Sequence, residues 1–150
     1  MSDKNHHYGP IVRLGVISLV MCGLLFPLLV TGLAQILLPY QANGEIVKLH
    51  GHDVGSILVA QNFTSPMFFH PRNASDSASG VDPHITLLDA YSQIPRIHNA
   101  TGISSDALKQ IADANVERTI WIAGDPYVNV LRLNLILIDR YPSVFQSFSQ

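Results

Sequence analysis

The stretch Leu14–Leu38, LGVISLVMCGLLFPLLVTGLAQILL, holds 25 consecutive residues without one charged side chain. An α-helix of that length spans about 37 Å, against roughly 30 Å for the hydrocarbon core of a bilayer. The stretch therefore predicts a transmembrane helix with some tilt. Pro27, near its middle, lacks a backbone donor and predicts a kink there.

A cleaved secretory signal is the alternative interpretation of the same stretch. Gly32 and Ala34 are small residues at the spacing of a cleavage site before Gln35. However, the apolar run is longer than the core of such a signal, about 7 to 15 residues, and it continues past that site. We therefore expect an uncleaved anchor that divides the chain into a short N-terminus over 1–13, the helix over 14–38 and one domain over 39–150.

Charge predicts the orientation of this helix. Lys4 and Arg13 precede the span, whereas Lys48 is the first basic residue after it. Because positive residues favour the cytoplasmic side, the N-terminus is expected inside and the domain outside the cell membrane. The domain carries seven Lys/Arg against ten Asp/Glu, a mildly acidic balance that argues against nucleic-acid binding. The single cysteine, Cys22, lies within the span, so no disulfide is expected inside the domain.

The first part of the domain mixes strand and helix patterns. Asn43-Gly44 predicts a tight turn directly after the span. The sequence VGSILVAQNF, residues 54–63, predicts a buried strand by its length and β-branched content. Residues 86–97 form a weak helical pattern that places Leu87, Leu88, Tyr91 and Ile94 on one face. Pro95 is expected to end or kink that helix.

The second part of the domain predicts a better marked helix. Ser104 is its expected N-cap, and its apolar face consists of Leu108, Ile111, Ala112 and Val116. Residues 119–122 predict a short strand followed by a turn. Residues 128–138 fit either a strand or a helix capped by Asn129, and this choice stays open. Together the elements predict one N-terminal transmembrane α-helix followed by a small mixed α/β (α+β) extracytoplasmic domain.

A polar segment, FFHPRNASDSASGVDPHI over residues 68–85, raises the question of catalysis. A carboxylate beside an imidazole is the outline of a general base or of a metal's outer shell, so Asp82 with His70 or His84 suggests a membrane-anchored hydrolase. No serine of this segment stands in a Gly-x-Ser-x-Gly elbow, and a loop-ordering role is the favoured hypothesis.

Other motifs for chemistry are incomplete. His50, His52 and Asp53 in HGHD are residue types that bind zinc, but the sequence offers no further clear ligand to complete a site, and a solvated loop is expected. The chain contains no Gly-rich phosphate loop and no Asp-Lys-Thr-Gly-Thr phosphorylation sequence. We therefore assign no catalytic residue, no metal ligand and no resident cofactor.

Six motifs in one order, behind one apolar helix, carry a family resemblance. They are PYQANGEIV, GSILVAQNF, FFHPRNAS, SASGVDPHIT, QIPRIHNATGIS and GDPYVNVLRLNLIL. In this order they resemble the KdpC subunit of the Kdp potassium-transporting ATPase of bacteria and archaea. The resemblance covers nearly all of the chain from Gly23 onward.

The resemblance implies a non-catalytic subunit of a prokaryotic membrane complex for ATP-driven potassium uptake. Expected partners are a channel-like potassium-binding subunit of the KdpA type, a P-type ATPase subunit of the KdpB type and a small single-helix subunit. ATP acts through the complex, and potassium is the transported ion, bound by a partner. Family members are described as catalytic chaperones that raise the ATP affinity of the ATPase subunit. A structural role over the outer mouth of the potassium pathway fits the expected topology better, since ATP acts inside.

The resemblance also identifies candidate residues and one departure. Polar and turn residues of the motifs are expected to order loops or dock partners: Gln61, Asn62, Phe63, His70, Arg72, Asp82, Pro83, His84, Pro95, Arg96, Asn129 and Asn134. In the family a longer segment separates the motif FHxRPSA from SASGxD, whereas only Asp76 separates FFHPRNAS from SASG here. The join at NASDSASG therefore predicts a shortened member.

Overall fold

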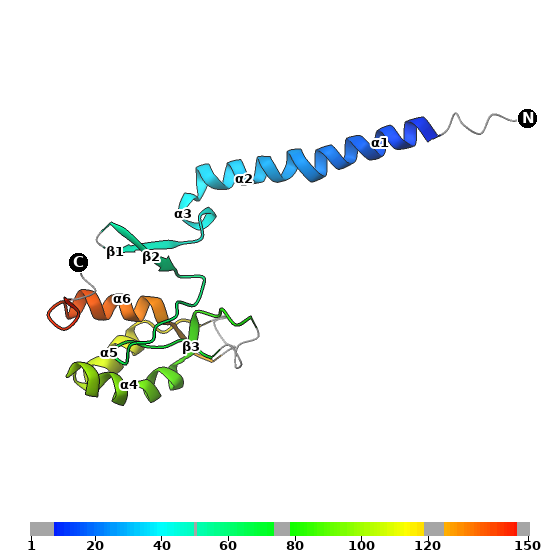
Figure 1. Ribbon diagram of the computed structural model, residues 1–150. Helices are drawn as coiled ribbons and strands as arrows, with labels where there is room; N and C mark the ends of the chain where they lie inside the picture. The colour runs from blue at the N-terminus through cyan, green and yellow to red at the C-terminus, as the bar shows by residue number, and fades with distance from the viewer. Residues whose placement is uncertain (1–7, 50, 74–78, 119–124, 147–150) are drawn as a thin grey trace, which may run out of the picture. The chain divides into compact units, whose positions relative to one another are not determined.

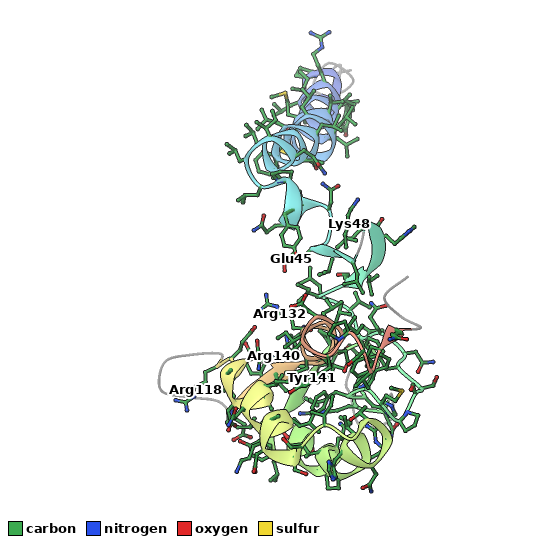
Figure 2. The ribbon with its side chains drawn as sticks, turned by 90° about the vertical axis from the view of Figure 1, so that its left-hand side faces the viewer. Glu45, Lys48, Arg118, Arg132, Arg140 and Tyr141 are labelled. Atoms are coloured by element: carbon green, nitrogen blue, oxygen red, sulfur yellow. The ribbon has the colours of Figure 1, made fainter. Side chains whose placement is uncertain are left out.

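The computed structural model describes residues 8–49, 51–73, 79–118 and 125–146. The chain divides between Asn43 and Gly44 into two compact units. The first contains an apolar helix, Tyr8–Leu37, of 30 residues with a mean hydropathy of 2.4, which is long and apolar enough to cross a membrane. Its side chains are exposed along its length and project all round it (Figure 2).

This helix consists of α1 (Tyr8–Val20), a π-helical turn η2 (Met21–Leu25) and α2 (Phe26–Leu37). Pro27 lies in the first turn of α2, directly after the π-helical turn. The Phe26 N–H bonds to the Met21 carbonyl, five residues back, as in a π-helix. The wider π-helical turn thus lies where Pro27 interrupts the regular hydrogen bonds of the α-helix.

The helix ends at Leu37, and Pro39 opens the one-turn helix α3 (Pro39–Ala42). The Asn43 side chain then folds back, donating to Gln35 Oε1 at 3.1 Å and to the Pro39 carbonyl at 2.6 Å. Gly44 follows with φ +79°, a left-handed conformation that glycine adopts without strain. The tight turn predicted at Asn43-Gly44 is confirmed.

Within the described residues, the second unit contains two small antiparallel sheets. In the first, β1 (Ile46–Leu49) pairs with β2 (His52–Ser56) as a hairpin. In the second, β3 (His84–Thr86) pairs with β4 (Tyr127–Asn129). The second sheet joins segments that lie far apart in the sequence, and α4 follows directly from β3 (Figure 1).

The buried strand predicted for VGSILVAQNF is wrong: β2 ends at Ser56, where an irregular segment begins, and Val54 within β2 is 37% exposed. The Ala60 N–H donates to the Val81 carbonyl at 2.9 Å, and the Ile57 carbonyl accepts from Asn129 Nδ2 at 2.8 Å. The N–H and carbonyl groups of this segment therefore bond to separate parts of the chain, and a neighbouring strand is not needed to satisfy them.

Helix α4 (Leu87–Thr101) is longer than predicted and passes through Pro95. Proline inside a helix costs about 3 kcal/mol, which is why a helix usually ends before it. Burial of Ile94 and Ile97 on either side offsets that cost, since each fully buried isoleucine contributes about 1.5–3 kcal/mol. The predicted position of Leu88 on the apolar face is wrong, because its side chain is 76% exposed.

Helix α5 (Ser105–Ala114) begins as predicted, since the Ser104 hydroxyl accepts from the Ala107 N–H at 3.3 Å. Its buried face is formed by Leu108, Ile111 and Ala112, with Val116 partly buried against the core. For residues 128–138, the helical alternative is right: α6 (Val130–Arg140) follows β4, and Asn129 caps it. The strand predicted over 119–122 lies outside the described residues.

Helices α4, α5 and α6 enclose one hydrophobic core together with the strands β3 and β4 (Figure 1). Its largest fully buried apolar side chains include Phe69, Ile85, Ile97, Leu108, Leu133, Leu137 and Phe145. Phe69 comes from the loop between β2 and β3, so the core forms only if that loop is held in place.

Candidate functional site

The loop of residues 65–70, which we call the clamped loop, is held by two helices. Asn134 on α6 is 1% exposed, and its amide pairs with the backbone of Phe69. Asn134 Oδ1 accepts from the Phe69 N–H at 2.8 Å, and Asn134 Nδ2 donates to the Phe69 carbonyl at 2.9 Å. The side chain thus replaces the neighbouring strand that would otherwise satisfy both groups.

Two residues of α4 hold the same loop from another side. Gln93 Oε1 accepts from the His70 N–H at 2.8 Å, and Gln93 Nε2 donates to the His70 carbonyl at 3.1 Å. The Arg96 guanidinium donates to the carbonyls of Pro66 and Phe68 at 2.7 and 2.9 Å. Burial lowers the pKa of Arg96 from its ordinary value. These backbone acceptors compensate for the water that burial removes.

His70 is part of this clamp. Its Nε2 lies 2.8 Å from the Ser65 carbonyl, within hydrogen-bond distance. The Arg96 guanidinium lies 3.3 Å from the same nitrogen. Nε2 is therefore engaged within the protein and does not offer a lone pair to a substrate.

Asp82 and His84 form a separate local arrangement at the start of β3. Asp82 Oδ1 accepts from the His84 N–H at 3.0 Å and lies 3.3 Å from His84 Nδ1. The His84 ring packs edge-on against Tyr127, with ring centroids 4.9 Å apart. No hydrogen bond or ion pair among the described residues joins this pair to His70, and no group of three metal-ligating side chains occurs among them. The arrangement stabilises a turn, which is the loop-ordering alternative for this segment.

Asn129 and Pro83 connect this turn to α6. Asn129 is 2% exposed, and its Oδ1 accepts from the Arg132 N–H at 3.1 Å as the helix cap. Its Nδ2 donates to the Ile57 carbonyl at 2.8 Å. The Pro83 carbonyl, also buried, accepts from the Val130 N–H at 3.0 Å. One asparagine therefore caps a helix and fixes a distant loop.

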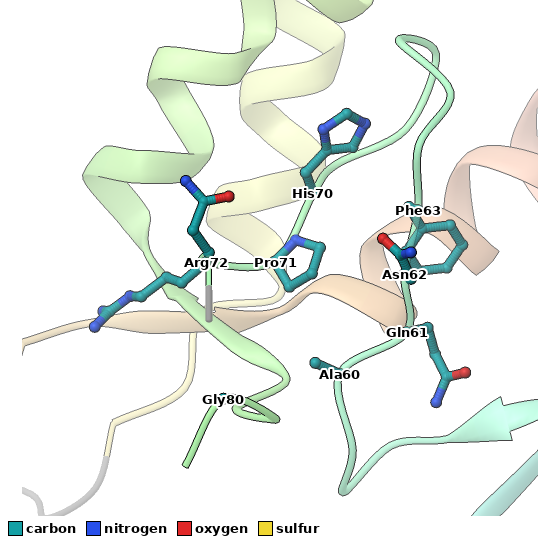
Figure 3. Close-up of a pocket in the computed structure, with 9 residues that line it drawn as sticks. Ala60, Gln61, Asn62, Phe63, His70, Pro71, Arg72 and Gly80 are labelled. Carbon is teal, nitrogen blue, oxygen red and sulfur yellow. The ribbon is translucent and has the colours of Figure 1, made fainter. Parts of the chain in front are cut away.

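Residues 60–63 and 70–73 line a surface pocket of about 330 Å³ (Figure 3). Phe63 is one of the lining residues, and its ring centroid lies 5.5 Å from that of Phe68. Gln61 Nε2 donates to the Val59 carbonyl at 3.1 Å, while Asn62 is exposed. In Figure 3 the Arg72 side chain points away from the segment 60–63.

Asn62, Arg72 and Pro95 are the candidate residues that are exposed at the surface. Arg72 borders two further hollows, of about 520 and 370 Å³. Its Nε lies 3.9 Å from an Asp89 carboxylate oxygen, and both side chains are at least 37% exposed. Such an exposed ion pair adds at most about 1 kcal/mol. Arg72 therefore remains available to a partner at little cost.

The sequence predictions missed Gln93. It lies in the motif QIPRIHNATGIS, three residues before Arg96, and this spacing places both side chains on one face of α4. Arg96 NH2 also donates to Gln93 Oε1 at 2.8 Å. The i, i+3 spacing was the available signal for a paired role.

A nucleophile for the hydrolase hypothesis is not positioned in the part of the domain that the structure describes. The Ser65 hydroxyl accepts from the Met67 N–H at 3.4 Å, and Ser79 Oγ accepts from the Val81 N–H at 3.3 Å. Ser75 and Ser77 lie outside the described residues. Among the candidate residues, Arg96, Asn129 and Asn134 tie loops to helices.

The described residues thus combine an apolar helix long enough to cross a membrane with a small α+β domain whose polar residues hold its own loops, an arrangement that fits the class of membrane-anchored subunits. The sequence profile described as "K+-transporting ATPase, c chain", KdpC, matches residues 8–76 and 73–139. The chain belongs to the KdpC family. It is thus an accessory subunit of a potassium-transporting ATPase and not the catalytic enzyme itself.

Three relatives, each named potassium-transporting ATPase KdpC subunit, are similar over most of their length. The protein of Caldanaerobacter subterraneus is 30% identical over 179 residues, with 86% of this chain and 93% of the relative covered. That of Koribacter versatilis is 32% identical over 180 residues, covering 87% and 93%. That of Myxococcus xanthus is 34% identical over 182 residues, covering 87% and 86%.

These alignments exceed the 150 residues of this chain, so the relatives contain positions without a counterpart here. The two profile matches overlap at residues 73–76, within NASDSASG. The matches agree with the shortened join predicted at this point. Asn73 and Gly80, on either side of the join, both line the pocket of Figure 3.

Proposed function

We propose that this chain is anchored with its N-terminus in the cytoplasm and its domain outside, as part of a high-affinity potassium uptake complex. The orientation is supported by Lys4 and Arg13 before the helix, against Lys48 after it. The single observation that carries the proposal is the family match, which includes both the apolar helix and the domain up to residue 139.

The partners follow from that membership. A channel-like subunit of the KdpA type binds potassium, a P-type ATPase subunit of the KdpB type hydrolyses ATP, and a small single-helix subunit completes the membrane part. This chain holds no cofactor of its own in the proposal. Its domain docks on the outer side of the channel-like subunit and steadies the potassium entrance.

The clamped loop suits such a docking role. Gln93, Arg96 and Asn134 fix its backbone from two helices, so the adjoining surface is rigid before a partner arrives. A preorganised surface loses little conformational entropy on binding, which favours a stable assembly. Asn62, Arg72 and Pro95 are exposed on this domain and are the proposed docking residues.

The catalytic-chaperone role described for the family is the second part of the proposal, and we assign it to assembly. A domain outside the membrane does not reach the nucleotide on the inner side. Any rise in ATP affinity therefore comes through a steadier complex and not through contact between this domain and ATP. The complex with and without this chain should differ in amount and lifetime more than in its affinity for ATP.

The test is co-purification of the tagged chain with the channel-like and ATPase subunits, combined with potassium uptake. Replacing Asn62, Arg72 and Pro95 together by alanine should lower recovery of the channel-like subunit. Gln110→Ala, at an exposed position on α5, is the matched control and should leave recovery unchanged. If the triple variant retains full recovery, another surface docks. If the unaltered chain purifies as a solitary monomer from cells that produce all subunits, the proposed function itself fails.

A further inference from the structure

The base of the β1–β2 hairpin presents an apolar patch, which consists of Ile46, Leu58 and Val59. Their side chains are 42%, 53% and 43% exposed, respectively. Register brings them together: Ile46 pairs with Ser56, and the Ile57 N–H donates to the Glu45 carbonyl at 3.2 Å. The Val59 N–H closes the following turn on the Ser56 carbonyl at 3.4 Å.

The covalent chain ties this patch to the end of the membrane helix. Asn43 hydrogen-bonds Gln35, which lies within the last turn of α2. Ile46 follows Asn43 by three residues, and at 3.8 Å between consecutive Cα atoms its Cα stays within about 11 Å of that of Asn43 in any arrangement. The headgroup region on each side of a bilayer is roughly 5–8 Å thick. If α2 spans the bilayer, the patch lies within reach of that region.

We propose that Ile46, Leu58 and Val59 insert into the outer headgroup region of the bilayer, so that the hairpin base rests on the lipid surface. The inference relies on the proposed membrane anchoring and goes beyond it. A bilayer is present beside the helix end wherever the chain is inserted, and it removes apolar side chains from water without requiring any other protein.

The charged neighbours are compatible with this position. Lys48 lies on β1 with its ammonium 3.4 Å from an Asp53 carboxylate oxygen, and both side chains are more than 60% exposed. Glu45 and Lys48 flank Ile46 along the start of β1 (Figure 2). A lysine beside an apolar surface keeps its charge in the aqueous headgroup layer while its methylenes lie against the lipid. The three patch residues themselves carry no polar side-chain atom.

The experiment uses the full chain in phosphatidylcholine vesicles that contain phosphatidylglycerol. In a Cys22→Ser background, single cysteines at Leu58 or Val59 receive an environment-sensitive fluorophore. Leu88→Cys is the matched control, because Leu88 is an exposed leucine on α4 of the same domain. Leu28→Cys within α2 reports membrane insertion separately. The quenchers are lipids that carry a spin label near the headgroup, and aqueous iodide.

Labels at Leu58 and Val59 should be quenched more strongly by the spin-labelled lipid than by iodide, and Leu88 should show the reverse order. The proposal is overturned if Leu58 behaves like Leu88, or if its label is shielded from both quenchers, which would indicate a protein partner. If Leu28 also escapes the lipid quencher, the membrane anchor itself is refuted. The two failures are therefore distinguishable.

Discussion

Replacing Asn134 by alanine should destabilise the domain by removing both hydrogen bonds to Phe69. The N–H and carbonyl of Phe69 would then stay buried without a partner, since this residue is 0% exposed. Each unsatisfied buried group costs about 1–3 kcal/mol, so we expect a loss of about 2–6 kcal/mol in the free energy of unfolding. For a domain of this size a loss of 3 kcal/mol corresponds to a decrease in Tm of roughly 12–24 °C.

Thermal unfolding of the full chain in detergent, followed by near-ultraviolet circular dichroism, measures this decrease. Asn99→Ala, at an exposed position in α4, is the control and should change the free energy of unfolding by about 0.5 kcal/mol or less. Asn134→Leu retains a similar shape without the hydrogen bonds and should resemble Asn134→Ala. If Asn134→Leu is as stable as the unaltered protein, packing and not hydrogen bonding holds the clamped loop, and the reasoning is refuted.

Three further predictions concern other contacts of the domain. Arg96→Lys keeps the charge, but a lysine cannot donate to several carbonyls at once, so the free energy of unfolding should fall by about 1–3 kcal/mol. An unchanged Tm would show that Arg96 does not hold the clamped loop. Gly55→Ala should change Tm only slightly: its Cβ would lie 2.6 Å from Gln61 Cδ, the far end of a flexible side chain that can turn aside, and a drop in Tm of many degrees would contradict this. The hydrogen bond to Asp113 raises the pKa of Tyr91 above its ordinary 10.0, so this hydrogen bond stabilises the fold below pH 10 and is lost as pH rises through the raised pKa. Tyr91→Phe should therefore show a smaller decline in Tm above pH 10. An identical dependence of Tm on pH in both proteins would refute this role of Tyr91.

Local sequence patterns were sufficient to predict several elements of the fold. Ser104 and Asn129 cap helices through hydrogen bonds to residues three positions on, and such spacing is visible in the sequence. The apolar face of α5 follows from helical periodicity for the same reason. These interactions involve neighbours along the chain, so they do not depend on where the rest of the domain lies.

The mispredicted elements depend on distant contacts. VGSILVAQNF has strand composition, but Asn129, 72 residues from Ile57, satisfies the backbone where a neighbouring strand would otherwise be required. Pro95 has the chemistry of a helix terminator, yet the burial of Ile94 and Ile97 keeps α4 continuous. In both cases tertiary packing outweighed a correct local preference.

The candidate residues were selected as a set, and their individual roles came only from the structure. His70 and Asp82 have the side chains of a catalytic pair, but each bonds to its own part of the fold. Arg96 and Gln93 act together on a loop that begins 28 residues earlier than Gln93. A side chain's partner depends on which segments the fold brings together, and residue type alone does not specify that.

The sequence by itself determined a segment long and apolar enough to span a bilayer, because 25 uncharged residues in a row have that length whatever follows them. It also determined the family, through six motifs in a fixed order. The tertiary structure alone decided that Asn134 holds Phe69 across 65 residues, and that Arg96 and Asn129 also tie loops to helices. The physical reason is that apolar length and helix caps are local properties, whereas a buried polar group takes whichever partner the folded chain places beside it.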